Sequence, residues 1–323
     1  MNVTLDTGGS TLMAVPARHY CSPFAREVNR LCSDEDSRPE AIAVELGPLM
    51  TRELARWMAE LGTGPGKKSP LPCMLGILVS NRLIDVSKRN TALFLQEYYS
   101  VGLSEVDPEI LRELLDFAGD HLMCLSATDS MIEAIRCALE YGIPLFGVDL
   151  EEFVRGPGFS HPLTEEPGYG DFDLARFVAI NEPAAVRARD ARADQRRETA
   201  MAARLKKLLS QFNRVLFTCG LAHWGSIRAL LHDPALRPAD LLPSFTPSLP
   251  KDHRPPSFST PACRTGGLMS GRKSDLPSSS YTPAVRRVIV HPTMAMAFMD
   301  TFPIMTTLYE NARNPPDLHA ESG

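Results

Sequence analysis

The feature that most constrains the fold of this chain is the alternation of short apolar runs with amphipathic segments. The runs have the length of buried strands and are Thr11–Val15, Ala41–Leu46, Pro144–Leu150 and Arg214–Cys219. The segments between them carry apolar residues at helical spacing. Strands that alternate with helices in this way predict an α/β domain with a largely buried sheet.

The expected helices have caps or amphipathic faces that can be read from the residues. They are Ser22–Leu31, Leu49–Leu61, Asp129–Tyr141, Ala184–Ser210 and Trp224–Leu231. Ser22 is the expected N-cap of the first, Asp129 that of the third, and Gly142 its C-terminal cap. The remaining segments are expected as a mostly helical stretch at Cys73–Tyr99, a helix at Pro108–Phe117, a short strand or turn at Leu122–Leu125, a strand at Val288–Val290 and a helix at Met294–Tyr309.

The 323 residues divide by composition into one main domain and an insert. Residues 1–232 are expected to form the α/β domain. Residues 233–284 are rich in Pro and Ser, which favours a loop or disordered insert. Residues 285–311 are expected to add a strand and a helix to the same domain, and residues 312–323 to form a tail.

Charge and cysteine usage exclude several classes of protein. The formal net charge is −5, so we expect no nucleic-acid partner. The start of the chain lacks the features of a secretory signal, and the longest apolar stretch is interrupted by charge and proline, so no membrane span is expected. Seven scattered cysteines without a C-x-x-C pair favour free thiols and a cytoplasmic location. A homo-oligomer is compatible with all of this.

Four polar side chains fall at the ends of the predicted strands. His19 lies just beyond the first strand, Glu45 ends the second, Asp149 ends the third, and His223 follows the fourth in a Gly-x-x-His turn. Ligands of open α/β sheets bind beyond the carboxyl ends of the strands. Two imidazoles and two carboxylates there can hold a divalent metal or act without one as an acid/base set. Helix capping and surface packing are the alternative explanations for the individual residues.

The long helix expected at Ala184–Ser210 has a polar stripe that continues its apolar face. The stripe contains Asp190, Asp194, Arg197 and Glu198, with Met201 after them. Arg197 can hold an anionic group or stabilise an oxyanion. A solvated charged face is the alternative. Cys219 next to the Gly-x-x-His turn is expected to be a buried, inert thiol, and the common nucleotide-binding, zincin and serine-hydrolase motifs are absent from the sequence.

Several of these segments, in their order along the chain, resemble one superfamily. They are Ala43-Val44-Glu45-Leu46, the stretch Asp129 to Asp149, Arg197–Ala202, and the strand Val215–Cys219 followed by Gly220-Leu221-Ala222-His223. The pattern is similar to that of the superfamily that joins the TraB/PrgY/GumN proteins, the Tiki metalloproteases, the erythromycin esterases and the ChaN-like haem-uptake proteins. The first Gly-x-x-His motif of these proteins corresponds to Pro16-Ala17-Arg18-His19, with Pro in place of Gly.

The resemblance implies a mixed central sheet flanked by helices, with two pseudo-repeated halves that face one cleft. It implies His19 and His223 as paired histidines, Glu45 as the acid and Arg197 as the basic helix residue. Metal-dependent members have a hydrolytic metal centre, esterase-like members a metal-free histidine base, and ChaN-like members bind haem.

We therefore expect a hydrolase that cleaves a peptide, ester or amide bond of a small-molecule or peptide substrate. The expected catalytic residues are Glu45, His223, His19 and Arg197, and the expected substrate-binding residues are Asp149, Asp194, Glu198 and Gly220. In the metal-dependent version His19, Glu45 and His223 ligate Mn, Co or Zn; haem is a lesser alternative. The rival hypothesis is a non-catalytic or regulatory protein that binds haem or a small anionic metabolite at the same place.

Overall fold

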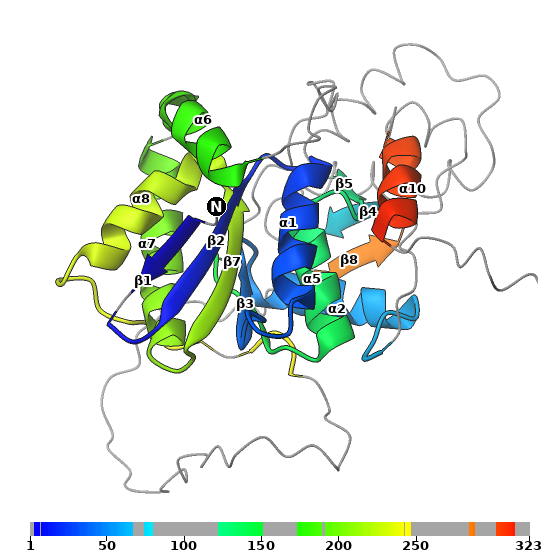
Figure 1. Ribbon diagram of the computed structural model, residues 1–323, viewed down its shortest axis with the longest axis horizontal. Helices are drawn as coiled ribbons and strands as arrows, with labels where there is room; N and C mark the ends of the chain where they lie inside the picture. Colours follow the sequence, from blue (N-terminus) through cyan, green and yellow to red (C-terminus); the bar gives the residue numbers. More distant parts are fainter. Residues whose placement is uncertain are drawn as a thin grey trace, which may run out of the picture.

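The computed structural model describes residues 3–6, 8–66, 74–79, 122–150, 173–188, 191–241, 243–246, 284–287 and 302–313. Their main feature is a five-stranded sheet with the strand order β1-β2-β7-β3-β6 (Figure 1). The strands are β1 (Val3–Asp6), β2 (Thr11–Ala17), β3 (Ala41–Val44), β6 (Leu145–Gly147) and β7 (Arg214–Gly220). β2, β7, β3 and β6 run parallel, and β1 is antiparallel at the edge. The prediction of an α/β fold with a mixed central sheet is confirmed.

Helices cover both faces of this sheet. α1 (Ser22–Ser33) and α5 (Ser130–Tyr141) pack together on one face, and α7 (Ala191–Leu209) and α8 (Leu221–His232) pack together on the other (Figure 1). α6 (Leu174–Ala188) packs on α8 and also reaches α1, where the Phe177 and Phe24 rings meet edge to face at 5.0 Å. α2 (Pro48–Glu60) lies against α5 and β6.

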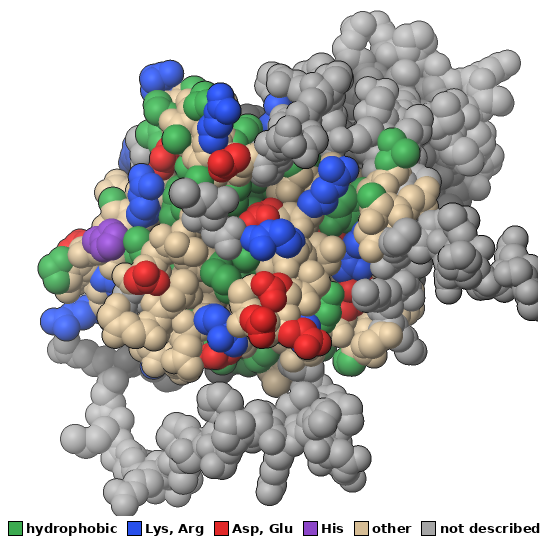
Figure 2. Space-filling view, viewed as in Figure 1, with side chains coloured by type: hydrophobic (Ala, Val, Ile, Leu, Met, Phe, Trp, Pro, Cys, Tyr) green, Lys and Arg blue, Asp and Glu red, His purple; other side chains and the backbone are tan. Residues whose placement is uncertain are grey.

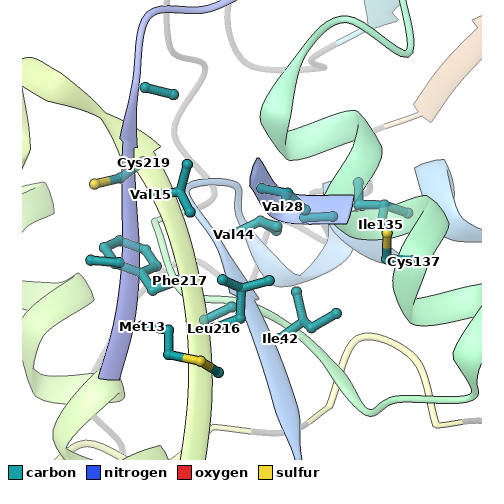
Figure 3. Packing of buried hydrophobic residues seen from close by; sticks show 14 of the residues in the cluster. Met13, Val15, Val28, Ile42, Val44, Ile135, Cys137, Leu216, Phe217 and Cys219 are labelled. Atoms are coloured by element: carbon teal, nitrogen blue, oxygen red, sulfur yellow. The ribbon is translucent and has the colours of Figure 1, made fainter. Parts of the chain in front are cut away.

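The core lies between the strands and the helices of each face. Figure 3 shows part of this core, in which Val15 of β2, Val44 of β3 and Leu216 of β7 lie near Val28 of α1. These four side chains are completely buried. Burial of each such side chain contributes about 1.5–3 kcal/mol, and this explains why every residue of β3 is apolar.

A second sheet has three antiparallel strands in the order β5-β4-β8. They are β4 (Met74–Val79), β5 (Leu122–Leu125) and β8 (Ala284–Arg287). The expectation of helix from Cys73 was wrong for β4, because this six-residue apolar run pairs with strands that come from distant parts of the chain. Of the short strand or turn expected at Leu122–Leu125, the structure has the strand.

Three boundaries differ from those that the sequence predicts. β2 continues through Pro16 to Ala17, where it still pairs with β7. The described part of β1 begins at Val3 opposite Ala14, so no described strand pairs with Pro16 on that side, and proline is tolerated there. Cys21 rather than Ser22 is the N-cap of α1, and it caps without its side chain. α8 begins directly after Gly220, so His223 lies in its first turn rather than in a separate turn.

The helix expected at Ala184–Ser210 is divided into two elements, α6 and α7. α6 begins at Leu174 and contains Pro183 in its interior. Proline is normally tolerated only in the first turn of a helix, so the sequence does not predict a helix that begins before Pro183. In contrast, α5 has the predicted caps. The Asp129 carboxylate accepts from the backbone N–H of Met131 and Ile132, and Gly142 is left-handed with φ 64°.

The predicted insert begins with residues that pack against the edge of the main sheet. The backbones of Leu145 and Phe245 exchange hydrogen bonds of 3.0 and 3.2 Å, and the Ser244 hydroxyl accepts from Gly147. Gly147 is required there, because a Cβ atom at this position would lie 2.4 Å from Oγ1 of Thr51. The tail expected at residues 312–323 begins two residues too early, because α10 (Phe302–Arg313) continues to Arg313. The segments expected at Pro108–Phe117 and Val288–Val290, the helix start at Met294, and residues 314–323 lie outside the described residues.

The described surface carries both signs of charge. On the face in Figure 2, basic and acidic side chains are interspersed. No helix within the described ranges is long and apolar enough to cross a membrane. Cys21, Cys32, Cys137 and Cys219 are buried free thiols.

Candidate functional site

The four strand-end residues predicted from the sequence meet at one edge of the main sheet. β2, β3, β6 and β7 are parallel, so their carboxyl ends lie together. His19 follows β2 and Glu45 follows β3 directly. Asp149 lies two residues after β6, and His223 is in the first turn of the helix that follows β7.

Gly220 lies at the centre of this group. A Cβ atom at residue 220 would lie 3.4 Å from Nε2 of His19, 3.5 Å from Oε2 of Glu45 and 3.5 Å from Cδ2 of His223. Three side chains from three strand ends therefore converge on one residue that has no side chain of its own. The Gly220 N–H donates to Oε2 of Glu45 at 2.6 Å, which fixes the carboxylate at the start of α8.

His19 is held by a buried carboxylate. Its Nδ1 donates to Oδ2 of Asp129 at 3.2 Å, and the same oxygen accepts from the Tyr20 N–H at 3.2 Å. Tyr20 has a φ of 57°, which is left-handed and costly for a bulky residue, so the chain is under strain directly beside His19. Nε2 of His19 makes no hydrogen bond to any described residue, and the side chain is 27% exposed.

His223 is held in the same way by a second carboxylate. Its Nδ1 donates to Oε1 of Glu198 at 3.1 Å. Its Nε2 lies 3.3 Å from Oε1 of Glu45 and 3.5 Å from Nη1 of Arg197. A protonated His223 therefore donates to Glu45, whereas a neutral His223 accepts from Arg197.

Arg197 is the centre of a buried ion-pair network. Its Nη2 donates to Oε1 of Glu45 at 2.7 Å and to Oδ2 of Asp149 at 2.6 Å, and its Nε donates to the same oxygen of Asp149 at 3.0 Å. Nη1 donates to Oδ1 of Asp194 at 3.2 Å. The guanidinium is thus engaged by three carboxylates and ties α7 to the ends of β3 and β6.

The electrostatics of the site favour charged imidazoles and charged carboxylates. Burial alone would lower the pKa of His19, but the hydrogen bond and charge of Asp129, together with Glu45, raise it above the ordinary value. Burial likewise opposes the charge of His223, and Glu198 and Glu45 raise its pKa.

The carboxylates respond to the opposite charges. Burial favours neutral Glu45 and neutral Asp129, but His223, Arg197 and His19 lower the pKa of Glu45, and His19 lowers that of Asp129. Asp149 differs, because burial raises its pKa even with Arg197 beside it. Burial raises the pKa of Cys219 well above its usual range, as the prediction of an inert thiol requires.

The proposed metal ligands His19, Glu45 and His223 have the right chemistry, but Glu45 and His223 are already engaged. Both oxygens of Glu45 are hydrogen bonded, one of them to Arg197, which also approaches the Nε2 atom of His223. Within the described ranges, no group of three or more His, Cys, Asp or Glu side chains is arranged to hold a metal ion. The residues as they lie do not fit a divalent cation.

Sequence reasoning missed one residue of the site and assigned others differently. Asp129 was expected only as a helix cap, yet one of its oxygens caps α5 and the other holds His19. Glu198 was expected to bind substrate, and it contacts His223. Asp194 contacts Arg197. Asp190 lies outside the described residues. A contact between segments so far apart leaves no local signal in the sequence.

Comparison of the chain with protein-family models, with curated proteins and with solved structures gives no match.

Proposed function

We propose that this protein is a hydrolase that cleaves an ester, amide or peptide bond with a water molecule activated by His19 without a metal. The observation that carries the proposal is the pair of histidines at one sheet edge, each with its Nδ1 atom hydrogen bonded to a buried carboxylate. Such a carboxylate fixes the tautomer of an imidazole and stabilises its charged form.

His19 is the proposed general base. The N–H at Nδ1 is donated to Asp129, so the lone pair of a neutral ring is on Nε2. This atom faces Gly220, and the side chain is the most exposed of the three that converge there. A water molecule next to Nε2 would lose its proton to His19 as it attacks a carbonyl carbon.

His223 is the proposed proton donor of the reaction. Its raised pKa keeps the ring protonated more readily than an ordinary histidine. Its Nε2 lies 3.3 Å from Oε1 of Glu45, and the adjacent ring carbon Cδ2 faces Gly220. In the reaction the Nε2 N–H of the protonated ring passes from Glu45 to the carbonyl oxygen of the substrate, where it stabilises negative charge, and it then protonates the leaving group.

Arg197 and Glu45 have supporting roles in this proposal. The guanidinium is engaged by Glu45, Asp149 and Asp194, so it sets the position and charge of Glu45 rather than binding an anionic substrate group. We therefore assign Glu45 to the orientation of His223. Asp149, Asp194 and Glu198 support the same network.

The arrangement of the strands supports the further proposal of two related halves that face one site. β2 leads to α1 by way of His19, and the neighbouring parallel strand β7 leads to α8 by way of His223. This arrangement is what we would expect of a member of the TraB, Tiki, erythromycin-esterase and ChaN-like superfamily, and we propose membership on this basis. The metal-dependent version of the proposal requires Glu45 to release Arg197.

The proposal is tested with purified protein treated with a chelator and dialysed. Wild type, His19→Asn and His223→Asn are assayed against nitrophenyl esters, aminoacyl anilides and peptides, and the thermal stability of each variant is measured in parallel. The expected result is turnover by the wild type that both substitutions reduce by about 10²-fold or more with the fold intact.

The other outcomes identify the alternatives. Turnover that appears only after Mn, Co or Zn is restored would overturn the metal-free mechanism in favour of the metal-dependent hydrolase. Turnover that survives the His19 substitution would remove His19 as the base. No turnover of any substrate, with a haem absorbance band or thermal stabilisation by a bound anion, would favour the non-catalytic ligand-binding protein.

A further inference from the structure

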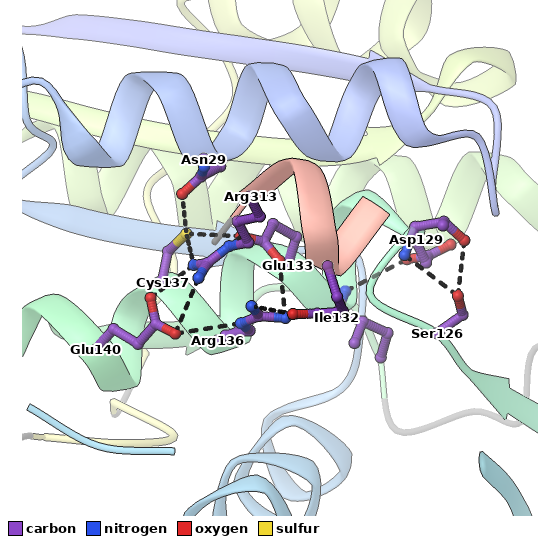
Figure 4. A network of polar contacts seen from close by, with 11 residues as sticks. Asn29, Ser126, Asp129, Ile132, Glu133, Arg136, Cys137, Glu140 and Arg313 are labelled. Atoms are coloured by element: carbon purple, nitrogen blue, oxygen red, sulfur yellow. Dashed lines mark hydrogen bonds and ion pairs between the residues drawn. The ribbon is translucent and has the colours of Figure 1, made fainter. Parts of the chain in front are cut away.

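A second buried cluster of charged side chains joins α5 to α10 (Phe302–Arg313), far along the chain (Figure 4). α5 contributes Glu133, Arg136 and Glu140, and α10 contributes Glu310 and Arg313. The side chains of Glu133 and Arg136 are completely buried, and that of Arg313 is 3% exposed. We call these five residues the α5–α10 cluster.

Almost every polar atom of the α5–α10 cluster is engaged. Arg136 donates through both terminal nitrogens to Glu310, and through Nε to Oε1 of Glu140 at 3.2 Å. Arg313 donates to Oε1 of Glu133 at 2.7 Å and to Oε2 of Glu140 at 2.6 Å. α10 is therefore fixed to α5 by charge-assisted hydrogen bonds.

The exception is Oε2 of Glu133. This oxygen is buried without a hydrogen-bond partner among the described residues, and the nearest cationic atom paired with it, Nη1 of Arg136, is 3.8 Å away. The hydroxyl of Tyr309 on α10 is also buried and unpartnered in the described part of the chain. An ionised carboxylate oxygen left in this state would be costly, whereas a protonated one would not carry charge.

The charge balance of the α5–α10 cluster also favours a proton on Oε2 of Glu133. Three carboxyl groups face two guanidinium groups, so full ionisation would leave an excess negative charge in the interior. One proton on a carboxyl group makes the cluster neutral. Glu133 is the carboxyl group with an oxygen that accepts no hydrogen bond from the described residues.

We propose that Glu133 carries a proton on Oε2 while α10 is docked, and that docking of α10 is therefore coupled to pH. In this arrangement the neutral cluster holds α10 against α5. The proposal is independent of the hydrolase mechanism, because the charged side chains of the α5–α10 cluster pair with one another rather than with those of the site.

The groups around Glu133 are consistent with this role. Burial raises the pKa of Glu133 despite the opposing charges of Arg136 and Arg313. Burial also raises the pKa of the Cys137 thiol and of the Tyr309 phenol well above their usual ranges, so both are neutral around pH 7. Among the described residues, the other charged and titratable groups that face this region are Arg136, Glu140 and Tyr141 of α5, Glu310 and Arg313 of α10, and Cys32 of α1. α1 also supplies Asn29.

The sign of the pH dependence follows from the proton balance. Glu133 in an undocked, solvated state has an ordinary pKa of about 4.3 and has lost its proton near neutral pH. Undocking therefore releases one proton, so the equilibrium constant for undocking rises about tenfold per pH unit between the ordinary and the raised pKa of Glu133. Above the raised pKa of Glu133 the docked state is also deprotonated, so the equilibrium constant for undocking no longer changes with pH.

Hydrogen exchange of the full-length protein, read by mass spectrometry, tests the proposal. Exchange of peptides that cover residues 302–313 is measured from about pH 5 to about pH 9 and corrected for the intrinsic effect of pH on exchange. Wild type is compared with Glu133→Gln, which mimics the protonated acid, and with Glu310→Gln, which weakens the Arg136 pair at every pH.

We expect wild-type protection of α10 to fall as pH rises, and we expect Glu133→Gln to keep α10 protected over the same range. Glu310→Gln should lower protection throughout. Wild-type protection that does not change with pH would overturn the proposal. So would a Glu133→Gln protein that docks α10 less well than wild type at neutral pH or fails to fold, because an ionised Glu133 would then be needed for its ion pairs.

Discussion

Nδ1 of His19 lies 3.2 Å from Oδ2 of Asp129, a residue 110 positions further along the chain. The other oxygen of Asp129 accepts from the Met131 N–H at 2.8 Å and so caps α5. One carboxylate therefore fixes both the start of a core helix and the orientation of the proposed base. The packing of α5 against α1 sets where the imidazole lies.

Substitution of Asp129 by Asn should separate these two tasks. Asn caps helices about as well as Asp, so α5 should still form, but an amide group turned to His19 no longer accepts from the buried Tyr20 N–H, so a stability loss of about 1–3 kcal/mol is expected. If the side-chain amide of Asp129→Asn donates to Nδ1 of His19, the proton of the neutral ring must be on Nε2. Nε2 then has no lone pair with which to accept a proton from water. We expect a loss of about 10²–10⁴-fold in kcat with no change in the circular dichroism spectrum. Activity equal to that of the wild type would contradict the orienting role.

The raised pKa of His19 predicts how activity depends on pH. The base must be neutral, so activity should rise with pH through an apparent pKa above the ordinary value of about 6.5. A fall at higher pH is expected when His223, whose pKa is also raised, loses its proton. The measurement is kcat/KM against pH with a chromogenic substrate. A rise centred below the ordinary histidine pKa would be inconsistent with the network.

The position that a Cβ atom would occupy at Gly220 offers a steric test of the site. Gly220 has a φ of −61°, which alanine adopts without strain, and an added methyl group would make only ordinary contacts with His19, Glu45 and His223. We expect Gly220→Ala to fold with a stability loss of at most about 1 kcal/mol and to lose most of its turnover.

The matched control for this test is Gly64→Ala. A Cβ atom at Gly64 would meet no atom within 4 Å, so both stability and turnover should be unchanged. Turnover by Gly220→Ala at the level of this control would show that substrate does not occupy the space next to Gly220.

Arg197 should be needed for stability as well as for activity. Replacement by Gln removes the cation that pairs with the buried Asp149 and one of the cations that pair with Glu45. Loss of one partner from a buried ion pair typically costs about 3–5 kcal/mol. We expect the free energy of unfolding, measured with urea, to fall by this amount in Arg197→Gln. It should change little in Arg196→Gln, because the Arg196 side chain is exposed. Equal stabilities of the two variants would remove Arg197 from the centre of the network.

The main sheet could be predicted because its strands are specified locally. Ala41–Val44 and Arg214–Gly220 are largely apolar runs of strand length, and the sequence predicts a helix after each of them. Parallel strands then bring Glu45 and His223 to one edge without further information. The α5 caps at Asp129 and Gly142 were equally readable, since capping depends on residues within one turn.

The parts that could not be predicted depend on contacts between distant segments. β4 is a strand because residues 122–125 and 284–287 pair with it, and its six apolar residues alone do not distinguish a strand from a helix. Nothing near Asp129 in the sequence indicates His19, and nothing near Glu133 indicates Arg313. The expected helix begins at Ala184, directly after Pro183, whereas α6 runs through this proline from Leu174 to Ala188. Packing of α6 compensates for the backbone hydrogen bond that proline cannot donate.

The central claim is that His19 is a base oriented by Asp129, and the most direct measurement is a nitrogen NMR titration of histidines in the full-length protein. Spectra of wild type, His19→Asn and Asp129→Asn assign the His19 ring. The account predicts that neutral His19 carries its proton on Nδ1, that its pKa lies above the ordinary histidine value, and that Asp129→Asn lowers this pKa. A neutral ring protonated on Nε2, with a pKa that the Asp129 substitution leaves unchanged, would contradict the account.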